Sequence, residues 1–105
     1  MRITIRSLFL VAAMACLAGS LGFAQSTGEA VYKSKCQMCH GPKGVPSAGM
    51  AKMMGVKPAN DPSMKKLTIA QMEDAVTKGK GKMKPVAGLS NAQVKDAVKY
   101  FRSLE

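Results

Sequence analysis

The feature that most constrains this chain is the segment Cys36-Gln37-Met38-Cys39-His40, in which two thiols lie three residues apart and an imidazole directly follows the second. On one turn of a helix, residues three apart project to the same side. Cys36 and Cys39 can therefore reach the two vinyl groups of one porphyrin and form thioethers. His40 can then coordinate the iron from one face. The motif predicts one covalently attached haem c, with His40 as an axial iron ligand.

The Cys pair has two other interpretations. It could form a small disulfide or a thioredoxin-like redox centre, but no βαβ pattern surrounds it. A structural zinc site needs four nitrogen or sulfur ligands, and residues 25–105 offer only Cys36, Cys39 and His40. The sequence therefore favours haem attachment over both.

The first 24 residues have the features of a secretory signal peptide. Arg2 and Arg6 precede an apolar run over residues 8–17, and Gly22-Phe23-Ala24 supplies small residues next to a cleavage site. Cleavage after Ala24 would leave residues 25–105 as one domain. We therefore expect a periplasmic protein with no stable membrane span after cleavage. The alternative is an uncleaved anchor, although the apolar run is short for a membrane helix.

The third cysteine, Cys16, lies inside this apolar run. A lipoprotein would use it as the acylated residue, but such a residue is expected after the apolar run. Its removal with the signal peptide leaves no Cys outside the motif, so no disulfide stabilises the domain. A chain of this size without disulfides has a small side-chain core. We therefore expect the haem-free protein to be poorly folded.

The chain is strongly basic, with 16 Lys and Arg against 6 Asp and Glu. Without Arg2 and Arg6 the balance is 14 against 6, a net charge of +8 for residues 25–105. Such a charge suits nucleic acid, an anionic membrane or an acidic protein. Export and the lack of any nucleic-acid motif disfavour nucleic acid. We expect redox partners with acidic docking surfaces.

Three segments carry the capping-box pattern, Ser or Thr followed three residues later by Glu or Gln. They predict helices over residues 26–38, 68–78 and 90–104. A shorter helix is expected over residues 47–54, with Gly55 ending it. The remaining part of residues 41–67 has no long periodic segment, which is unusual in a compact domain and is explained if it wraps a cofactor. No segment shows strand alternation, so the predicted fold class is all-α.

A second axial ligand is expected in the loop over residues 79–85. His40 is the only histidine, which excludes a second imidazole from the same chain. A methionine thioether is neutral and soft and stabilises ferrous iron. Met83 lies in this glycine-containing loop and is the first candidate, with Met53 or Met54 as the alternative. Lys80, Lys82 and Lys84 of the loop are either solvated or surround the exposed haem edge and attract an acidic partner.

Together these motifs resemble those of the small bacterial class I cytochromes c, which carry one haem with His and Met as axial ligands. The likeness covers nearly all of residues 25–105. It rests on the segments Gly28-x-x-x-Tyr32-x-x-x-Cys36, Cys36–Gly41, Gly79–Met83 and Tyr100–Leu104. The resemblance implies a cytochrome c-like fold of three main helices plus a short one, wrapped around a covalently bound haem.

The resemblance also implies particular contacts. In the family the first and last helices cross through a small residue and an aromatic on each, here Gly28 and Tyr32 against Ala97 and Tyr100. The family's axial His donates its second ring N–H to a backbone carbonyl, for which Pro46 is the candidate.

The family's axial Met corresponds to Met83. Lys84 stands between this residue and Pro85, whereas related sequences often have Pro directly after Met.

These observations predict a soluble, monomeric carrier of single electrons, not an enzyme. Full coordination by His40 and Met83 would leave no position for a substrate. One alternative is a haem enzyme or gas-binding sensor with an open iron site. The other is the cytochrome subunit of a larger oxidoreductase.

Overall fold

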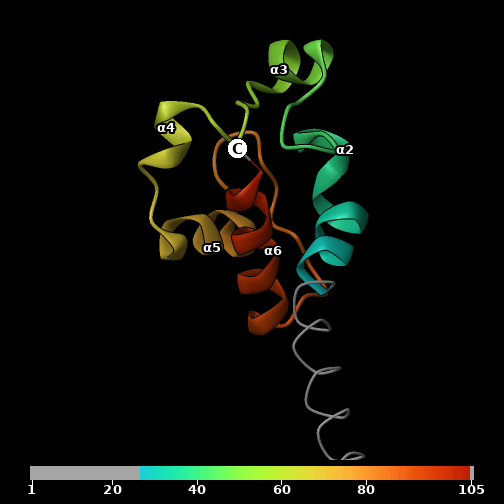
Figure 1. Ribbon diagram of the computed structural model, residues 1–105, viewed down its shortest axis with the longest axis vertical. Helices are drawn as coiled ribbons and strands as arrows, with labels where there is room; N and C mark the ends of the chain where they lie inside the picture. Colours follow the sequence, from blue (N-terminus) through green and yellow to red (C-terminus); the bar gives the residue numbers. More distant parts are fainter. Residues whose placement is uncertain (1–26, 105) are drawn as a thin grey trace, which may run out of the picture.

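The structure, a computed structural model, describes residues 27–104 (Figure 1). The expected signal peptide, residues 1–24, and the expected helix cap at Ser26 lie outside the described residues. Within residues 27–104 the regular elements are all helical, which confirms the all-α class. They are η1 (Tyr32–Cys36), α2 (Gln37–His40), α3 (Ala48–Met54), α4 (Pro62–Lys65), α5 (Ile69–Lys78) and α6 (Asn91–Ser103).

The N-terminal helical segment is continuous from residue 27 to residue 40 and changes type on the way. Residues 27–31 are α-helical, η1 is a π-helix and α2 returns to α-helix. The segment extends two residues beyond the expected end at Met38. π-Helical turns are rare and often occur at functional sites. Here the π-helix ends at Cys36, the first residue of the attachment motif.

The two long helices begin as the sequence predicts. In α5 the side chains of Thr68 and Gln71 each bond to the other's backbone N–H, and in α6 Ser90 and Gln93 do the same. Such reciprocal bonds satisfy amide groups that the first helical turn leaves without partners. The short helix α3 is also confirmed, with Ser47 as its N-cap and Gly55 in the left-handed conformation at its end.

Helix α4 is a second short helix that sequence reasoning missed. Asp61 caps it by accepting the Ser63 N–H at 2.9 Å, and Pro62 occupies the first turn. A capping residue followed by Pro is a signal for a helix start. The signal was present in the sequence, but the helix has only four residues and no periodic stripe.

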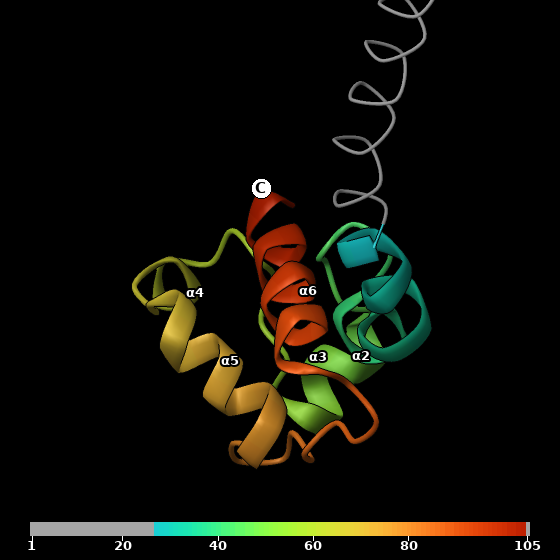
Figure 2. The same cartoon turned by 90° about the horizontal axis from the view of Figure 1, so that it is seen from below.

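Helix α6 lies between the N-terminal helical segment and the α4–α5 segment (Figures 1 and 2). Gly28 permits the crossing, because a Cβ there would lie 2.5 Å from the backbone oxygen of Asp96. The rings of Tyr32 and Tyr100 have centroids 5.3 Å apart. The expected crossing is thus confirmed, although the backbone that Gly28 approaches most closely belongs to Asp96 and not to Ala97.

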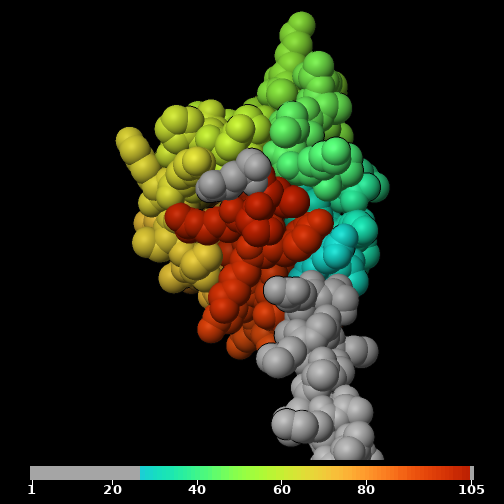
Figure 3. Space-filling model, viewed as in Figure 1, coloured from blue at the N-terminus to red at the C-terminus, as the bar shows by residue number. Residues whose placement is uncertain are grey.

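A small apolar core holds these helices together. Its buried members come from the N-terminal helix, α5, α6 and the segment before α4: Tyr32, Ala59, Met72, Val76, Val94, Val98 and Phe101. Helix α3 protrudes from this body in the space-filling view (Figure 3). Among residues 27–104, no helix combines the length and the hydrophobicity that a membrane crossing requires.

Candidate functional site

An apolar cavity with an empty volume of about 500 Å³, partly open to solvent, lies among η1, α2, α4, α5, α6 and the loop after α5. A concave, mostly apolar site of this kind is typical of small-molecule and cofactor binding. The lining residues are Tyr32, Cys36, His40, Met64, Leu67, Met72, Ala75, Val76, Met83, Ala97, Val98 and Phe101. Cys36, His40 and Met83, three of the four residues expected to hold the haem, therefore share one cavity.

Both cysteines of the motif are half-buried free thiols, so the structure contains no disulfide between them. Cys36 lines the cavity, whereas Cys39 is not among the lining residues. Burial raises the pKa of the Cys36 thiol, because an apolar environment disfavours a thiolate. A thiol at the edge of an apolar cavity can react with an apolar macrocycle bound there.

The surroundings of His40 favour the neutral imidazole. Burial lowers its pKa, since desolvation disfavours the charged ring, and the neutral ring is the form that binds metals. Its ring lies edge-on to Phe101, with centroids 5.1 Å apart and an interplanar angle of 65°. The Nδ1 atom is buried without a hydrogen-bond partner in the described part of the chain.

The unpartnered Nδ1 corrects one expectation. The resemblance implied a hydrogen bond from the His40 ring to the Pro46 carbonyl, and the structure does not form it. The ring packs against Phe101 instead.

The loop that carries Met83 is a tight turn anchored at both ends. Lys80 and Met83 exchange two backbone hydrogen bonds of 2.9 Å, and the Val86 N–H donates to the Val76 carbonyl at 2.8 Å. Gly79 has a φ of 79°, and a Cβ there would lie 2.8 Å from Cδ of Pro85. Lys84, the extra residue before Pro85, is accommodated outside the turn. The half-buried Met83 side chain lines the cavity.

The other methionines divide into two groups. Met64 and Met72 line the cavity, and the Met72 sulfur accepts a hydrogen bond from Arg102 at 3.7 Å. Met53 and Met54, the alternative ligands, are absent from the cavity lining, and Met53 is 72% exposed. Besides Met83, the methionines that line the cavity are therefore Met64 and Met72, not Met53 or Met54.

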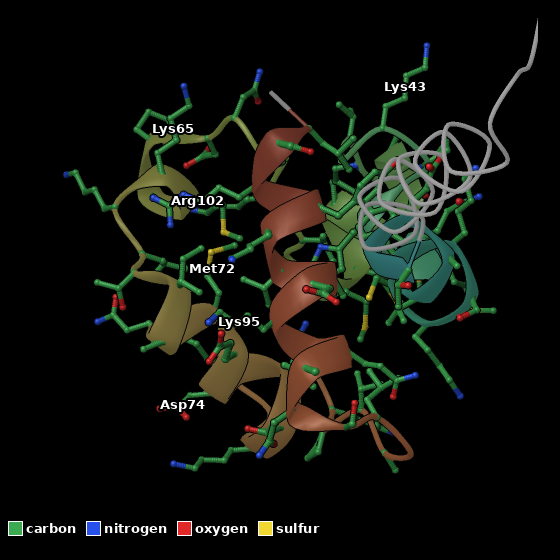
Figure 4. The ribbon with its side chains drawn as sticks, turned by 60° about the horizontal axis from the view of Figure 1, so that its bottom comes forward. Lys43, Lys65, Met72, Asp74, Lys95 and Arg102 are labelled. Carbon is green, nitrogen blue, oxygen red and sulfur yellow. The ribbon has the colours of Figure 1, made fainter. Side chains whose placement is uncertain are left out.

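Two polar side chains at the site were missed by sequence reasoning. The Tyr32 hydroxyl donates to the Gly41 carbonyl at 2.5 Å, and burial raises the pKa of Tyr32 to about 12. The sequence suggested only a packing role for this residue. Arg102 of α6 donates to the carbonyls of Leu67 and Lys65, at 2.5 and 2.8 Å (Figure 4). No local pattern identifies Arg102, because its partners lie more than thirty residues away.

Lys80, Lys82 and Lys84 of the loop are all exposed, and one of them also makes a hydrogen bond within the protein. Lys82 Nζ donates to the backbone carbonyl of Met53 at 2.9 Å. Lys80 and Lys84 flank it and are available to contact a partner. The loop thus presents positive charge next to the wall of the cavity that Met83 forms.

These observations fit a haem better than a bare metal ion. An apolar cavity suits a flat macrocycle, and its edge carries a thiol, a neutral imidazole and a thioether. In residues 27–104, no three His, Cys, Asp or Glu side chains are grouped as they would be around a metal ion.

Comparisons with known proteins agree with this fold. Residues 23–101 match the family described as "Cytochrome C oxidase, cbb3-type, subunit III". The solved structure of "KustC0563 c-type cytochrome" has the same fold, with a TM-score of 0.66 and 23% sequence identity, covering 74% of this chain and 96% of that one. No curated protein matches the chain. The chain belongs to the family whose model it matches, and it is a small class I cytochrome c.

Proposed function

We propose that the protein is an exported monohaem cytochrome that carries single electrons between redox partners. Cys36 and Cys39 would hold the haem c covalently, and His40 and Met83 would ligate its iron. The bound haem supplies one-electron redox chemistry. The observation that supports this most strongly is that Cys36, His40 and Met83 line one apolar cavity.

The chain's own residues account for the other requirements of a carrier. Phe101 and Val98 are buried and give the cavity an apolar wall, and an apolar environment tunes the reduction potential of a haem. The neutral His40 is ready to coordinate without losing a proton. With His40 and Met83 both bound, no coordination position remains for a substrate, so the protein acts as a carrier and not as an enzyme.

The proposed location is the periplasm, after cleavage of residues 1–24. The strongly positive charge supports partners with acidic surfaces, since opposite charges speed encounter in a salt-dependent way. The exposed Lys80 and Lys84 lie on the loop that also carries Met83. A partner docked there would lie next to the cavity.

The test of the proposal is to produce the full chain with a periplasmic haem-maturation system and to record absorption spectra in both redox states. A pyridine haemochrome assay with a mass measurement counts the haems and locates the cleavage site. We expect one haem on residues 25–105 and a thioether–iron charge-transfer band in the ferric state. Colourless protein would contradict haem attachment.

The identity of the second ligand is tested with three methionine variants. Met83→Ala should abolish the thioether–iron band and allow rapid CO binding by the ferrous protein. Met64→Ala and Met72→Ala are matched controls, because both side chains line the same cavity, and they should keep the band. Rapid CO binding by the wild-type ferrous protein would instead indicate an open-site enzyme or gas sensor.

A second candidate function is a cytochrome subunit of a larger oxidoreductase. The matching family, which is described as a subunit of a cytochrome c oxidase, favours it. The two candidates differ in solution mass. A monomer of residues 25–105 supports the free carrier, whereas purification from its native membrane with other chains would support the subunit.

A further inference from the structure

The Tyr32 hydroxyl joins the N-terminal helix to the turn that follows His40. Tyr32 is 1% exposed, and its ring packs against Tyr100 and Phe101, with centroids 5.3 and 6.0 Å away. At the far end of the ring, the hydroxyl donates a buried hydrogen bond of 2.5 Å to the Gly41 carbonyl. The ring thus connects the N-terminal helix to the first residue of the turn over residues 41–44.

The turn has little else to hold it in this conformation. Its own bond, from the Gly44 N–H to the Gly41 carbonyl, is long at 3.3 Å. Gly41 has a φ of 83° and a ψ of 158°, a region that only glycine readily adopts. The Gly44 carbonyl then accepts the Ala59 N–H at 2.8 Å, which connects the turn to the segment before α4.

His40 depends on this turn for its orientation. A ligating histidine is normally oriented by a hydrogen bond from its second ring nitrogen, and Nδ1 of His40 has no such partner among residues 27–104. Two constraints remain, the backbone link to Gly41 and the edge-on contact with Phe101. Tyr32 contacts both Gly41 and Phe101.

We propose that Tyr32 is a positioning residue for His40, and that its hydroxyl holds the turn over residues 41–44 so that the imidazole keeps its place in the cavity. The inference rests on the proposed role of His40 as iron ligand. The packing of the aromatic ring alone does not hold this turn. A Phe would supply the same packing, but it would leave the buried Gly41 carbonyl with only the 3.3 Å bond.

The test compares Tyr32→Phe with Tyr100→Phe in the haem-loaded protein. Each variant removes one hydroxyl from the same pair of touching rings. Amide hydrogen exchange and proton NMR are recorded in the diamagnetic ferrous state, together with the reduction potential and the melting temperature. The Gly44 N–H donates to the same Gly41 carbonyl that the Tyr32 hydroxyl holds. We therefore expect exchange at Gly44 to rise about tenfold in Tyr32→Phe as the turn loosens, an effect the size of one hydrogen bond. We also expect the His40 ring resonances and the potential to shift. Tyr100→Phe should leave the exchange rate at Gly44, the His40 ring resonances and the reduction potential unchanged.

A lower melting temperature in Tyr32→Phe, with Gly44 exchange and His40 resonances equal to those of Tyr100→Phe, would overturn the inference, because the hydroxyl would then contribute only stability. A second measurement needs no variant. The Tyr32 hydroxyl proton of the wild type should give a slowly exchanging resonance, and its absence would also count against the proposal. If the wild type holds no haem, the proposed function fails; if it holds haem and exchange at Gly44 is the same in the two variants, only this inference fails.

Discussion

Lys82 Nζ donates a hydrogen bond of 2.9 Å to the backbone carbonyl of Met53 and so ties the loop of Met83 to the end of helix α3. The last carbonyls of a helix lack partners within it, and a lysine near a helix C-terminus also interacts favourably with the helix dipole. The bond spans 29 residues of sequence. It is therefore a long-range constraint on the position of the Met83 loop.

Replacing Lys82 should make Met83 easier to displace. In Lys82→Met the loop loses its link to α3, and we expect the ferric protein to bind added imidazole about threefold more tightly, as for one exposed hydrogen bond. Lys84→Met is the matched control, since Lys84 lies in the same loop and is also exposed. The affinity is measured by absorption titration. Equal affinities in the two variants would show that the Lys82 bond does not restrain the loop.

Arg102 holds the corner between α4 and α5 against α6 (Figure 4). Its guanidinium donates to the carbonyls of Leu67 and Lys65 and to the Met72 sulfur. Arg102→Met keeps much of the apolar stem and removes these bonds. We expect it to lower the free energy of unfolding by about 2 kcal/mol, because bonds from a charged donor are stronger than neutral ones.

The measurement for Arg102→Met is guanidinium denaturation of the haem-loaded protein. Lys99→Met is the control, an exposed position on the same helix, and it should change stability by less than about 0.5 kcal/mol. A similar loss in both variants would assign the effect to charge or helix propensity and not to the contacts of Arg102.

The helices and most of the site could be predicted because their signals are local. Thr68 with Gln71 and Ser90 with Gln93 predict where α5 and α6 begin, and the structure shows both capping boxes. The motif from Cys36 to His40 and the loop position of Met83 depend on spacing along the chain. The structure then brings Cys36, His40 and Met83 to one cavity.

The rest could not be predicted because it depends on distant parts of the chain. The bonds of Lys82 and Arg102 connect residues 29 to 37 positions apart. The π-helical turn before Cys36 has no composition signal of its own. The Pro46 expectation was carried over from relatives, and the structure shows that His40 packs against Phe101 without this bond.

Gly41 should be the least replaceable glycine of the chain's turns. Its backbone has a φ of 83°, a conformation that only glycine readily adopts. A Cβ at this position would also collide with the Val45 carbonyl oxygen. Gly41→Ala should lower stability by more than about 3 kcal/mol and reduce the yield of haem-loaded protein. Gly55→Ala is the control, because Gly55 also has a positive φ, 67°, but no atom within 4 Å of its Cβ position.

Gly55→Ala should lower the free energy of unfolding by only about 1 kcal/mol, which is the penalty of the left-handed conformation for a residue with a Cβ. The melting temperatures and haem yields of the two variants separate backbone strain from collision. Equal losses would mean that the collision at Gly41 is relieved by a small movement of Val45.

Removal of the haem should abolish cooperative folding. The cavity is lined by apolar side chains that would lose their contacts with the macrocycle, and the loss of such contacts is destabilising. The double variant with Cys36→Ala and Cys39→Ala cannot attach haem, and we expect a broad thermal transition by circular dichroism. Met83→Ala keeps both cysteines and is the control, with a steep transition expected. If the thermal transition of the double variant were as steep as that of Met83→Ala, the side-chain core would be sufficient for cooperative folding without haem.

The stability of the protein should fall between pH 10 and pH 12 because of Tyr32. Burial raises the pKa of Tyr32 from 10.0 to about 12, with smaller contributions from Cys36 and Tyr100. The unfolded chain loses the phenol proton near pH 10 and the folded chain only near pH 12. The contribution of the buried neutral phenol is therefore complete below pH 10 and declines as the pH rises through this window.

The Tyr32→Phe variant isolates this effect, because it retains the lysines and Tyr100, which titrate in the same range. The difference in unfolding free energy between wild type and variant should shrink between pH 10 and pH 12, by at most about 1.4 kcal/mol per pH unit. Chemical denaturation of the haem-loaded proteins at pH 9, 10 and 11 measures it. In the proposed haem-loaded form Cys36 would be a thioether without charge, so burial, the largest cause of the raised Tyr32 pKa, would act there without the Cys36 contribution. A difference that stays constant across this range would mean that Tyr32 ionises in the folded protein as readily as in the unfolded one.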